Sequence, residues 1–196
     1  MRDPRLAEIE GLLTLKAEGQ YGLAAINQRQ HALQAALLAE RMGLPAAEIT
    51  AALLHDIGHM VHDLGQDPAA EGVDDLHEAR GEDYLRRWFG PEVTEPVRLH
   101  VAAKRFLCAT EADYFAKLSP DSVRSLSLQG GPMTAAEVAE FHANPACDAA
   151  VRLRRFDEQA KVKGLSTPPV AHFMRYVAEV IEPLLPDGYC SSPSIF

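Results

Sequence analysis

Histidine and aspartate residues recur along the chain with the types and spacing of metal ligands. They fall on five successive segments that we predict to be helical, and the set is His31, His55, Asp56, His77, His100 and Asp157. Buried imidazoles and carboxylates on converging helices need a shared partner, and a metal ion supplies one. Neighbouring helical residues differ in direction by about 100°, so His55 can bind one ion while Asp56 bridges to a second. The pattern predicts a two-metal site.

The donor types narrow the choice of metal. Imidazole and carboxylate without thiolate suit iron or manganese, and zinc less decisively. The three cysteines, Cys108, Cys147 and Cys190, are odd in number and widely spaced. This argues against both a disulfide framework and a thiolate zinc site. We therefore predict three structural thiols.

Cationic side chains accompany the proposed ligands. His59, Lys104 and Arg154 each lie three or four residues from one of them, a separation that places two residues on the same face of a helix. The chain as a whole has a net charge of −9, so positive potential would be concentrated at one place. We expect an anion-binding pocket beside the metals.

The elements that position these residues are predicted to be helices. Hydrophobic residues make up 47% of the chain and aromatic residues only 7%, which suits packed helices better than strands. Apolar periodicity and stop signals predict helices around residues 6–13, 28–42, 46–63, 77–89, 92–108, 146–160 and 170–185. The helix at 46–63 is apolar on most sides and should be central. The predicted fold class is all-α.

Short elements and connections complete the predicted fold. Three short helices are predicted between about 110 and 142, with starts marked by Thr110 and Asp113, by Ser119 and Pro120, and by Thr134 and Glu137. The segment 64–75 lacks periodicity and lies between two histidine-bearing helices, so we expect a loop that forms a wall or lid of the site.

Length and charge bound the organisation and the partners. We predict one domain over residues 1–186 and a loose tail over 187–196. The N-terminus is charged where a signal peptide would be apolar, and no segment approaches the ~18 apolar residues of a membrane span, so a cytoplasmic protein is expected. The net charge of −9 disfavours nucleic acid or an anionic membrane as a partner. No obligate protein partner is inferred.

The order of the ligands, H…HD…H…H…D, resembles that of the HD-domain superfamily of metal-dependent proteins. More specific are the strings YGLAAINQRQHALQ, ALLHDIGH, DDLHEARGEDYL, HVAAKRFLC, SLQGGPM and RLRRFD. Over roughly residues 20–160 the chain resembles the HD-domain mixed-valent di-iron oxygenases of organophosphonate breakdown. The resemblance implies a helical HD-domain bundle holding two irons, Fe2+ and Fe3+. It also implies the cleavage, with O2, of the C–P bond of 2-trimethylammonio- or 2-amino-1-hydroxyethylphosphonate to phosphate and glycine betaine or glycine.

Matching motifs assign roles to residues as the resemblance implies them. One iron would be held by His31, His55, Asp56 and Asp157, and the other by Asp56, His77 and His100. The phosphonate would be contacted by His59, Lys104, Ser122, Gln129 and Arg154. Catalytic roles would belong to Lys104, which stabilises charge, and to Tyr21, which matches a tyrosine that occupies the open iron position before substrate enters.

One departure from the family concerns the substituent of the substrate. Three residues after the tyrosine, the aminoethyl enzyme has a glutamate that serves the substrate amine, whereas this chain has Ala24. A small apolar side chain favours a bulkier trimethylammonium group or a substrate without an amine. Asp74 and Asp75 either supply a compensating negative charge or are solvated loop acids.

Two other functions compete with the oxygenase. The ligand pattern alone also suits two-metal hydrolysis, so an HD-type phosphohydrolase of a nucleotide or phosphate ester is the alternative, although the motifs around His31 and Gln129 argue against it. A hydrolase would release phosphate without O2. A sensor or scaffold with a structural metal is disfavoured, because none of the ligands is missing.

Overall fold

The computed structural model describes residues 3–18, 26–61 and 72–183, which contain helices and no β-strand. The α-helices, in chain order, are α1 (Pro4–Gly11), α2 (Gln28–Arg41), α3 (Ala46–Leu54), α4 (His77–Leu85), α5 (Pro91–Thr110), α6 (Pro120–Leu128), α7 (Ala135–His142), α8 (Cys147–Gln159) and α9 (Val170–Val180). The same described ranges also contain the π-helical η1 (Leu12–Lys16) and the 3-10 helices η2 (Ile57–Met60) and η4 (Phe115–Lys117). The all-α prediction is confirmed.

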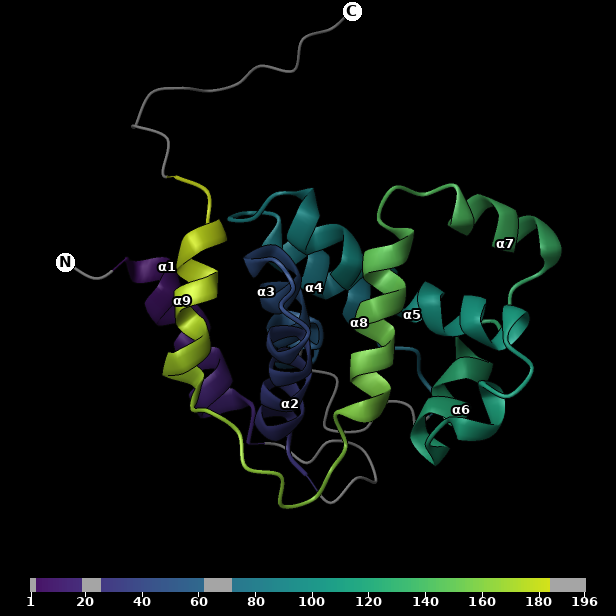
Figure 1. The fold of residues 1–196 in the computed structure, drawn as a ribbon, viewed down its shortest axis with the longest axis horizontal. Helices are drawn as coiled ribbons and strands as arrows, with labels where there is room; N and C mark the ends of the chain where they lie inside the picture. The colour runs from purple at the N-terminus through teal and green to yellow at the C-terminus, as the bar shows by residue number, and fades with distance from the viewer. Residues whose placement is uncertain (1–2, 19–25, 62–71, 184–196) are drawn as a thin grey trace, which may run out of the picture.

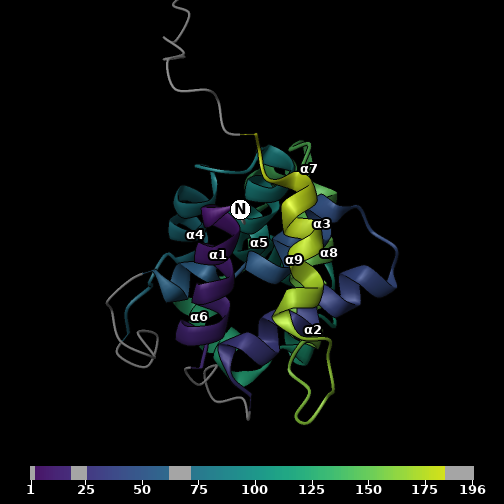
Figure 2. The same cartoon turned by 90° about the vertical axis from the view of Figure 1, so that its left-hand side faces the viewer.

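The helix α3 lies at the centre of the bundle, as predicted. It packs against α2, α5, α8 and α9, and every residue from Ile49 to Leu54 is buried. Figure 1 shows α1 and α9 on one side of α2 and α3, and α5 and α8 on the other side, with α6 and α7 beyond them. In Figure 2, turned by 90°, α1 and α9 lie in front of this core. The central position of α3 brings the residues at its C-terminal end into the interior.

The start of α2 is fixed by a capping box that positions His31. The side chain of Asn27 accepts a hydrogen bond from the backbone N–H of Gln30, and the side chain of Gln30 accepts one from the backbone N–H of Asn27. Two backbone donors that would otherwise be unsatisfied at a helix start are paired in this way. The cap therefore sets where the first turn begins and on which face His31 lies.

The predicted helix over 46–63 is wrong beyond its middle. The α-helix ends at Leu54, His55 is its C-cap, and Asp56 leaves the helical conformation at φ −99° and ψ 13° before the 3-10 turn of η2 begins. The cause is a tertiary contact, because η2 packs against α4 and Gly58 lies against the backbone of His77. The break occurs inside the His-Asp pair and directs its two side chains separately.

Other boundaries are partly as predicted. Ser119 and Thr134 cap α6 and α7 with their side chains, which confirms two of the predicted starts. The first of the three predicted short helices is present as η4, but it begins at Phe115 and not at Thr110 to Asp113, because Thr110 is the last residue of α5. The last helix ends at Val180 rather than near 185.

Some expectations fall on residues that the structure does not describe. The tail predicted over 187–196 and residues 64–71 of the predicted loop belong to this group. Among the described residues, no helix has both the length and the apolar character needed to cross a lipid bilayer.

The close approach at Gly58 can be tested by substitution. A Cβ atom at this position would lie 1.9 Å from the carbonyl oxygen of His77, so Gly58→Ala has to push η2 away from α4. We expect a loss of about 3 kcal/mol in the free energy of unfolding, measured by urea denaturation. Gly11→Ala is the matched control, because no atom lies within 4 Å of its Cβ position. Its free energy of unfolding should differ from that of the wild type by less than ~1 kcal/mol. Equal stabilities for the two variants would contradict the contact.

Candidate metal centre

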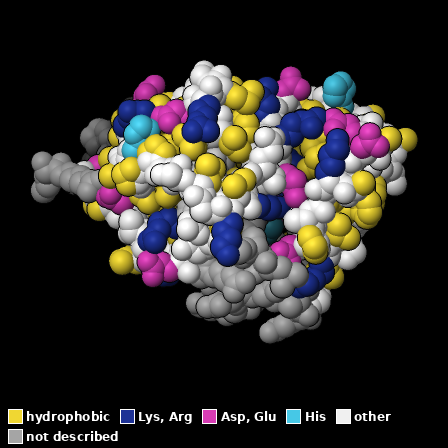
Figure 3. Space-filling model, turned by 60° about the horizontal axis from the view of Figure 1, so that its bottom comes forward, with side chains coloured by type: hydrophobic (Ala, Val, Ile, Leu, Met, Phe, Trp, Pro, Cys, Tyr) yellow, Lys and Arg dark blue, Asp and Glu magenta, His cyan; other side chains and the backbone are white. Residues whose placement is uncertain are grey.

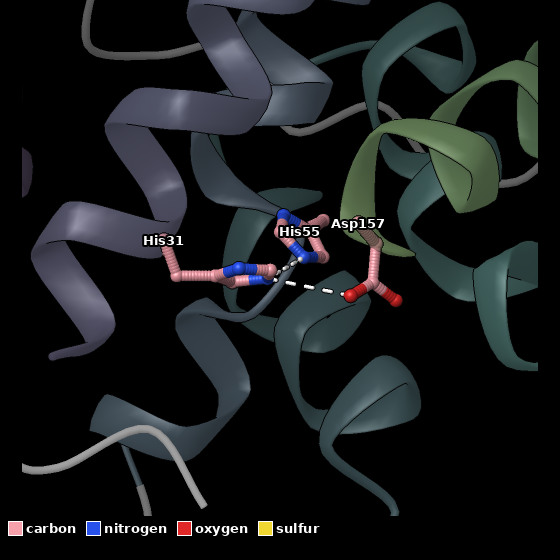
Figure 4. Close-up of side chains that lie close together, drawn as sticks. All are labelled: His31, His55 and Asp157. Carbon is pink, nitrogen blue, oxygen red and sulfur yellow. Dashed lines mark hydrogen bonds and ion pairs between the residues drawn. The ribbon is translucent and has the colours of Figure 1, made fainter. Parts of the chain in front are cut away.

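The first group of predicted ligands meets where α2, α3 and α8 converge. His31 Nε2 lies 3.0 Å from His55 Nε2 and 3.4 Å from Asp157 Oδ1. Figure 4 shows the three side chains pointing toward one another from separate helical elements. All three are buried. Two imidazole nitrogens and a carboxylate oxygen therefore face a common point in the interior.

The second group lies beside the first and is joined to it by Asp56. His77, the first residue of α4, and His100, in the middle of α5, place their Nε2 atoms 3.1 Å apart. Oδ1 of Asp56 lies 3.7 Å from each of these nitrogens. Its other oxygen, Oδ2, lies 3.4 Å from the Nε2 atoms of both His31 and His55. One carboxylate thus faces both histidine pairs, and all six predicted ligands are close together.

The orientation of each histidine is set by a hydrogen bond on its outer nitrogen. A carbonyl or carboxylate oxygen can only accept, so each Nδ1 carries a proton, and the Nε2 atom of a neutral ring directs its lone pair inward. The acceptors are the carbonyl oxygens of Ala160 for His31 (2.8 Å), Ala52 for His55 (2.9 Å) and Val97 for His100 (2.6 Å), and the carboxylate of Asp75 for His77 (2.9 Å).

These residues fit a pair of metal ions. The Nε2 atoms of His31 and His55 are 3.0 Å apart, and their inward lone pairs repel unless a positive charge lies between them. In addition, Oδ2 of Asp56 is buried and has no hydrogen-bond partner, which is costly for a carboxylate. Burial would raise the pKa of Asp56, but the surrounding histidines, His55 first, outweigh it and hold the pKa well below its usual range. A divalent cation at each pair would satisfy the nitrogens and the ionised carboxylate together.

The pKa values of the two histidines in the second pair are shifted in opposite directions. Burial, aided by the charge of His77, lowers the pKa of His100 to about 3. Burial would also lower the pKa of His77, but the hydrogen bond to Asp75 and the negative charges of Asp56, Asp75 and Glu78 together outweigh it and raise this pKa to about 9. The proton on His77 at neutral pH therefore lies between the two Nε2 atoms. A metal ion binding here has to displace it.

Two buried cations lie beside the first group of ligands. Arg154, on α8, donates to the ligand Asp157, to the hydroxyl oxygen of Tyr114 (3.0 Å) and to Ser122 Oγ (3.1 Å). Lys104, on α5, is buried as well and donates to Ser125 Oγ at 2.7 Å. Burial, and next the charge of Arg154, lower the pKa of Lys104 to about 7. Figure 3 shows basic and acidic side chains next to each other around a hollow on one face of the molecule.

The remaining predicted contacts are distributed around the same site. His59, on η2, stacks on the metal-ligand candidate His77 with ring centroids 4.2 Å apart. Gln129 follows α6, and its Oε1 atom is buried without a hydrogen-bond partner. Tyr21 and Ala24 lie outside the described residues, so their predicted roles stay predictions.

Two further charged residues of the site, Glu158 and Lys161, were not identified from the sequence. Glu158 accepts hydrogen bonds from Ser122 Oγ (3.0 Å), Lys161 Nζ (3.1 Å) and Arg154. Glu158 and Lys161 follow Arg154 by four and seven residues, a helical spacing that could have indicated them. Asp75 is buried, so its interpretation as a solvated loop acid is wrong.

The class of protein follows from this geometry and from comparison. Five helical elements direct an H…HD…H…H…D set of side chains to one point, and residues 29–145 match the model of the HD domain. The chain belongs to the HD-domain family.

Known relatives narrow this class. The chain is 50% identical over 161 residues to the hydroxymethylphosphonate dioxygenase of Gimesia maris, covering 81% of this chain and 79% of that protein. It is 40% identical over 174 residues to the 1-hydroxy-2-(trimethylamino)ethyl phosphonate dioxygenase (glycine-betaine-forming) of Leisingera caerulea, covering 89% of each. An uncharacterized protein of Acanthamoeba polyphaga mimivirus is 32% identical over 157 residues, which cover 79% of this chain and 71% of that protein.

The shared carboxylate predicts how metal binding depends on single ligands. We expect Asp56→Ala to weaken both Co2+ sites at least ~100-fold, because its two oxygens face both histidine pairs, and His100→Ala to weaken only one. Equilibrium dialysis with Co2+ measures the stoichiometry and affinities. His142→Ala, at an exposed histidine, is the control and should bind as the wild type does. Wild-type binding by Asp56→Ala would rule out the bridging role.

The buried lysine predicts a cost in stability that depends on pH. The pKa of Lys104 is lowered from 10.5 to about 7, so between these values the unfolded chain binds more protons and the folded protein gains stability as pH rises. Lys104→Met removes this dependence and should make the metal-free protein more stable by about 2 kcal/mol at pH 7, with a smaller gain at pH 9. Thermal unfolding at both pH values measures this. Lys117→Met, at an exposed lysine, is the control, and its stability relative to the wild type should be the same at both pH values. If Lys104→Met also showed the same relative stability at both pH values, the lowered pKa of Lys104 would be contradicted.

Proposed function

We propose that the chain is a di-iron dioxygenase that cleaves the carbon–phosphorus bond of a 1-hydroxyphosphonate. The observation that supports this most strongly is the joining of two histidine pairs by Asp56 next to the buried cations Lys104 and Arg154. Both named relatives are phosphonate dioxygenases. Imidazole and carboxylate donors without thiolate suit iron.

The six ligands divide between the two ions as their geometry suggests. His31, His55 and Asp157 would hold one iron, and His77 and His100 the other, with Asp56 shared. The second iron then has fewer protein ligands, which leaves positions for a substrate. When bound, the iron pair supplies the activation of O2 and the transfer of electrons.

The residues beside the ligands are suited to hold a phosphonate. Arg154 provides positive charge, and a bound phosphonate would favour the protonated form of Lys104. The Gln129 amide would donate through its N–H2 group, and the Ser122 hydroxyl would donate after turning away from Glu158. Charged hydrogen bonds are strong in a buried site, where water does not compete for the oxygens. Fixed at this end, the substrate would present its hydroxyl-bearing carbon to the metals. His59, beside His77, would face the same anion.

The overall reaction balances with O2 as the oxidant. R–CH(OH)–PO3²⁻ and O2 give R–COO⁻, HPO4²⁻ and H⁺. The C–H and C–P bonds are broken, carbon is oxidised, and the electrons that it loses reduce O2. A hydroxymethyl substrate, where R is hydrogen, would give formate.

Hydroxymethylphosphonate is the first substrate that we propose. The relative named for it shares 50% identity with this chain, against 40% for the relative named for the trimethylamino compound. Ala24 also offers no carboxylate to a substrate amine. The trimethylammonio substrate is the second candidate, because a quaternary ammonium needs no hydrogen-bond acceptor.

The proposal predicts which conditions release phosphate. Protein loaded with Fe2+ without oxygen should release phosphate from hydroxymethylphosphonate only after O2 is admitted. We expect kcat/KM to be at least about tenfold higher than for the 2-amino-1-hydroxyethyl analogue, because a buried ammonium without a partner is disfavoured. Phosphate and formate are measured together, and the trimethylammonio compound completes the panel.

Two ligand variants test the assignment of the metal ligands, and simple phosphate esters test the alternative function. His100→Ala and Asp157→Ala should stay folded by circular dichroism and lose turnover, because each lacks an iron ligand. Full activity in either variant would contradict the assignment of ligands. Release of phosphate from simple esters without O2, and none from the phosphonates, would establish a hydrolase instead.

A further inference from the structure

We infer that Asp75 is a positioning residue whose carboxylate joins the second metal position to the phosphonate pocket through His59. The inference rests on the proposed function for the identity of the anion. The contacts from which it is argued all lie between described residues. A role in metal binding and anion binding together goes beyond the function proposed above.

Both oxygens of Asp75 are engaged with histidines. Oδ1 lies 2.9 Å from Nδ1 of His77, and Oδ2 lies 2.7 Å from Nδ1 of His59. The backbone N–H of His77 also donates to Oδ1 at 3.3 Å. The two rings are stacked, with centroids 4.2 Å apart and planes 20° apart. One buried carboxylate thus holds a metal-ligand candidate and an anion-binding candidate side by side.

This arrangement differs from that of the other three ligand histidines. Their Nδ1 atoms donate to backbone carbonyl oxygens, as described above, and His77 alone among the four donates to a charged side chain. A carboxylate partner makes an imidazole a stronger metal ligand than a carbonyl does. The nearby carboxylate of Glu78 lies 3.8 Å from the same nitrogen, too far to replace Asp75 as the acceptor.

The backbone between Asp75 and His77 supports a specific placement. Leu76 has φ 50° and ψ 38°, and within residues 3–18, 26–61 and 72–183 no other non-glycine residue has a positive φ. This left-handed conformation is disfavoured for a residue with a Cβ. The Leu76 side chain is 50% exposed, so its packing does not account for the conformation. The turn instead directs the side chains on both sides of Leu76 into the site, as strained backbone at functional positions often does.

The physical consequence is that one carboxylate, that of Asp75, orients both a proposed metal ligand and a proposed anion-binding residue. An anion that contacts the His59 ring acts on the carboxylate that orients His77. Without Asp75, His77 and His59 each lose the carboxylate oxygen that lies at their Nδ1 atom. Metal affinity at the second position and anion affinity should therefore fall together. A carboxylate that only stabilised the start of α4 would affect neither.

Binding experiments test this without turnover. We expect Asp75→Asn to weaken the second Co2+ site about 10- to 100-fold, with the first unchanged, and to weaken binding of inorganic phosphate to the Co2+-loaded protein several-fold. Calorimetry measures both. Asp74→Asn removes the same charge from the neighbouring residue and should match the wild type. Asp75→Glu keeps the charge and should recover part of both losses. Wild-type Co2+ affinity in Asp75→Asn would overturn the inference.

A double variant tests the connection to His59. If Asp75 acts on the anion through His59, then Asp75→Asn in a His59→Ala background should weaken phosphate binding little further. Additive losses would overturn the connection. Because neither probe requires catalysis, a protein that binds Co2+ and phosphate as expected but cleaves no phosphonate would refute the proposed function and leave the role of Asp75 intact.

Discussion

The buried carboxylate of Asp56 is the constraint on which the site and much of the fold depend. A charge in the interior is costly unless it is paired, and Asp56 has histidines on four sides that would hold metal ions against it. These histidines come from α2, from the end of α3, and from α4 and α5, so the helices have to converge on one point. The break between α3 and η2 serves the same requirement, because it turns Asp56 away from the helix direction followed by His55.

The charges around this carboxylate form one connected system. Arg154 contacts the ligand Asp157 on one side and Ser122 and Glu158 on the other. Asp75 makes a similar connection on the opposite side, between His77 and His59. Each proposed metal position therefore has one charged neighbour that also contacts a residue proposed to bind the phosphonate. A negatively charged substrate would be bound by the same groups that orient and neutralise the ligands, so metal binding and substrate binding cannot be independent.

The sequence was sufficient to predict which six residues lie together and insufficient to predict the contacts that orient them. Residue type and helical spacing predicted the six ligands and the cations Lys104 and Arg154, because these features are local. Periodicity could not reveal the end of α3 at Leu54, since the need for Gly58 arises from the backbone of His77, a contact between distant segments. Asp75 was ambiguous for the same reason. Its burial and its two histidine partners exist only after η2 and α4 have packed together.

The division between shared and variable parts of the site bears on substrate choice. The two named relatives act on phosphonates that differ in the group on the reacting carbon and agree in the phosphonate itself. In this chain the cations suited to the phosphonate, Lys104 and Arg154, are buried on α5 and α8, which pack against each other. A rigid pair of helices is suited to the constant end of the substrate. The substituent must then meet residues elsewhere, and we propose Ala24 as one of them, because residues 22–26 include none of the predicted metal ligands or phosphonate contacts.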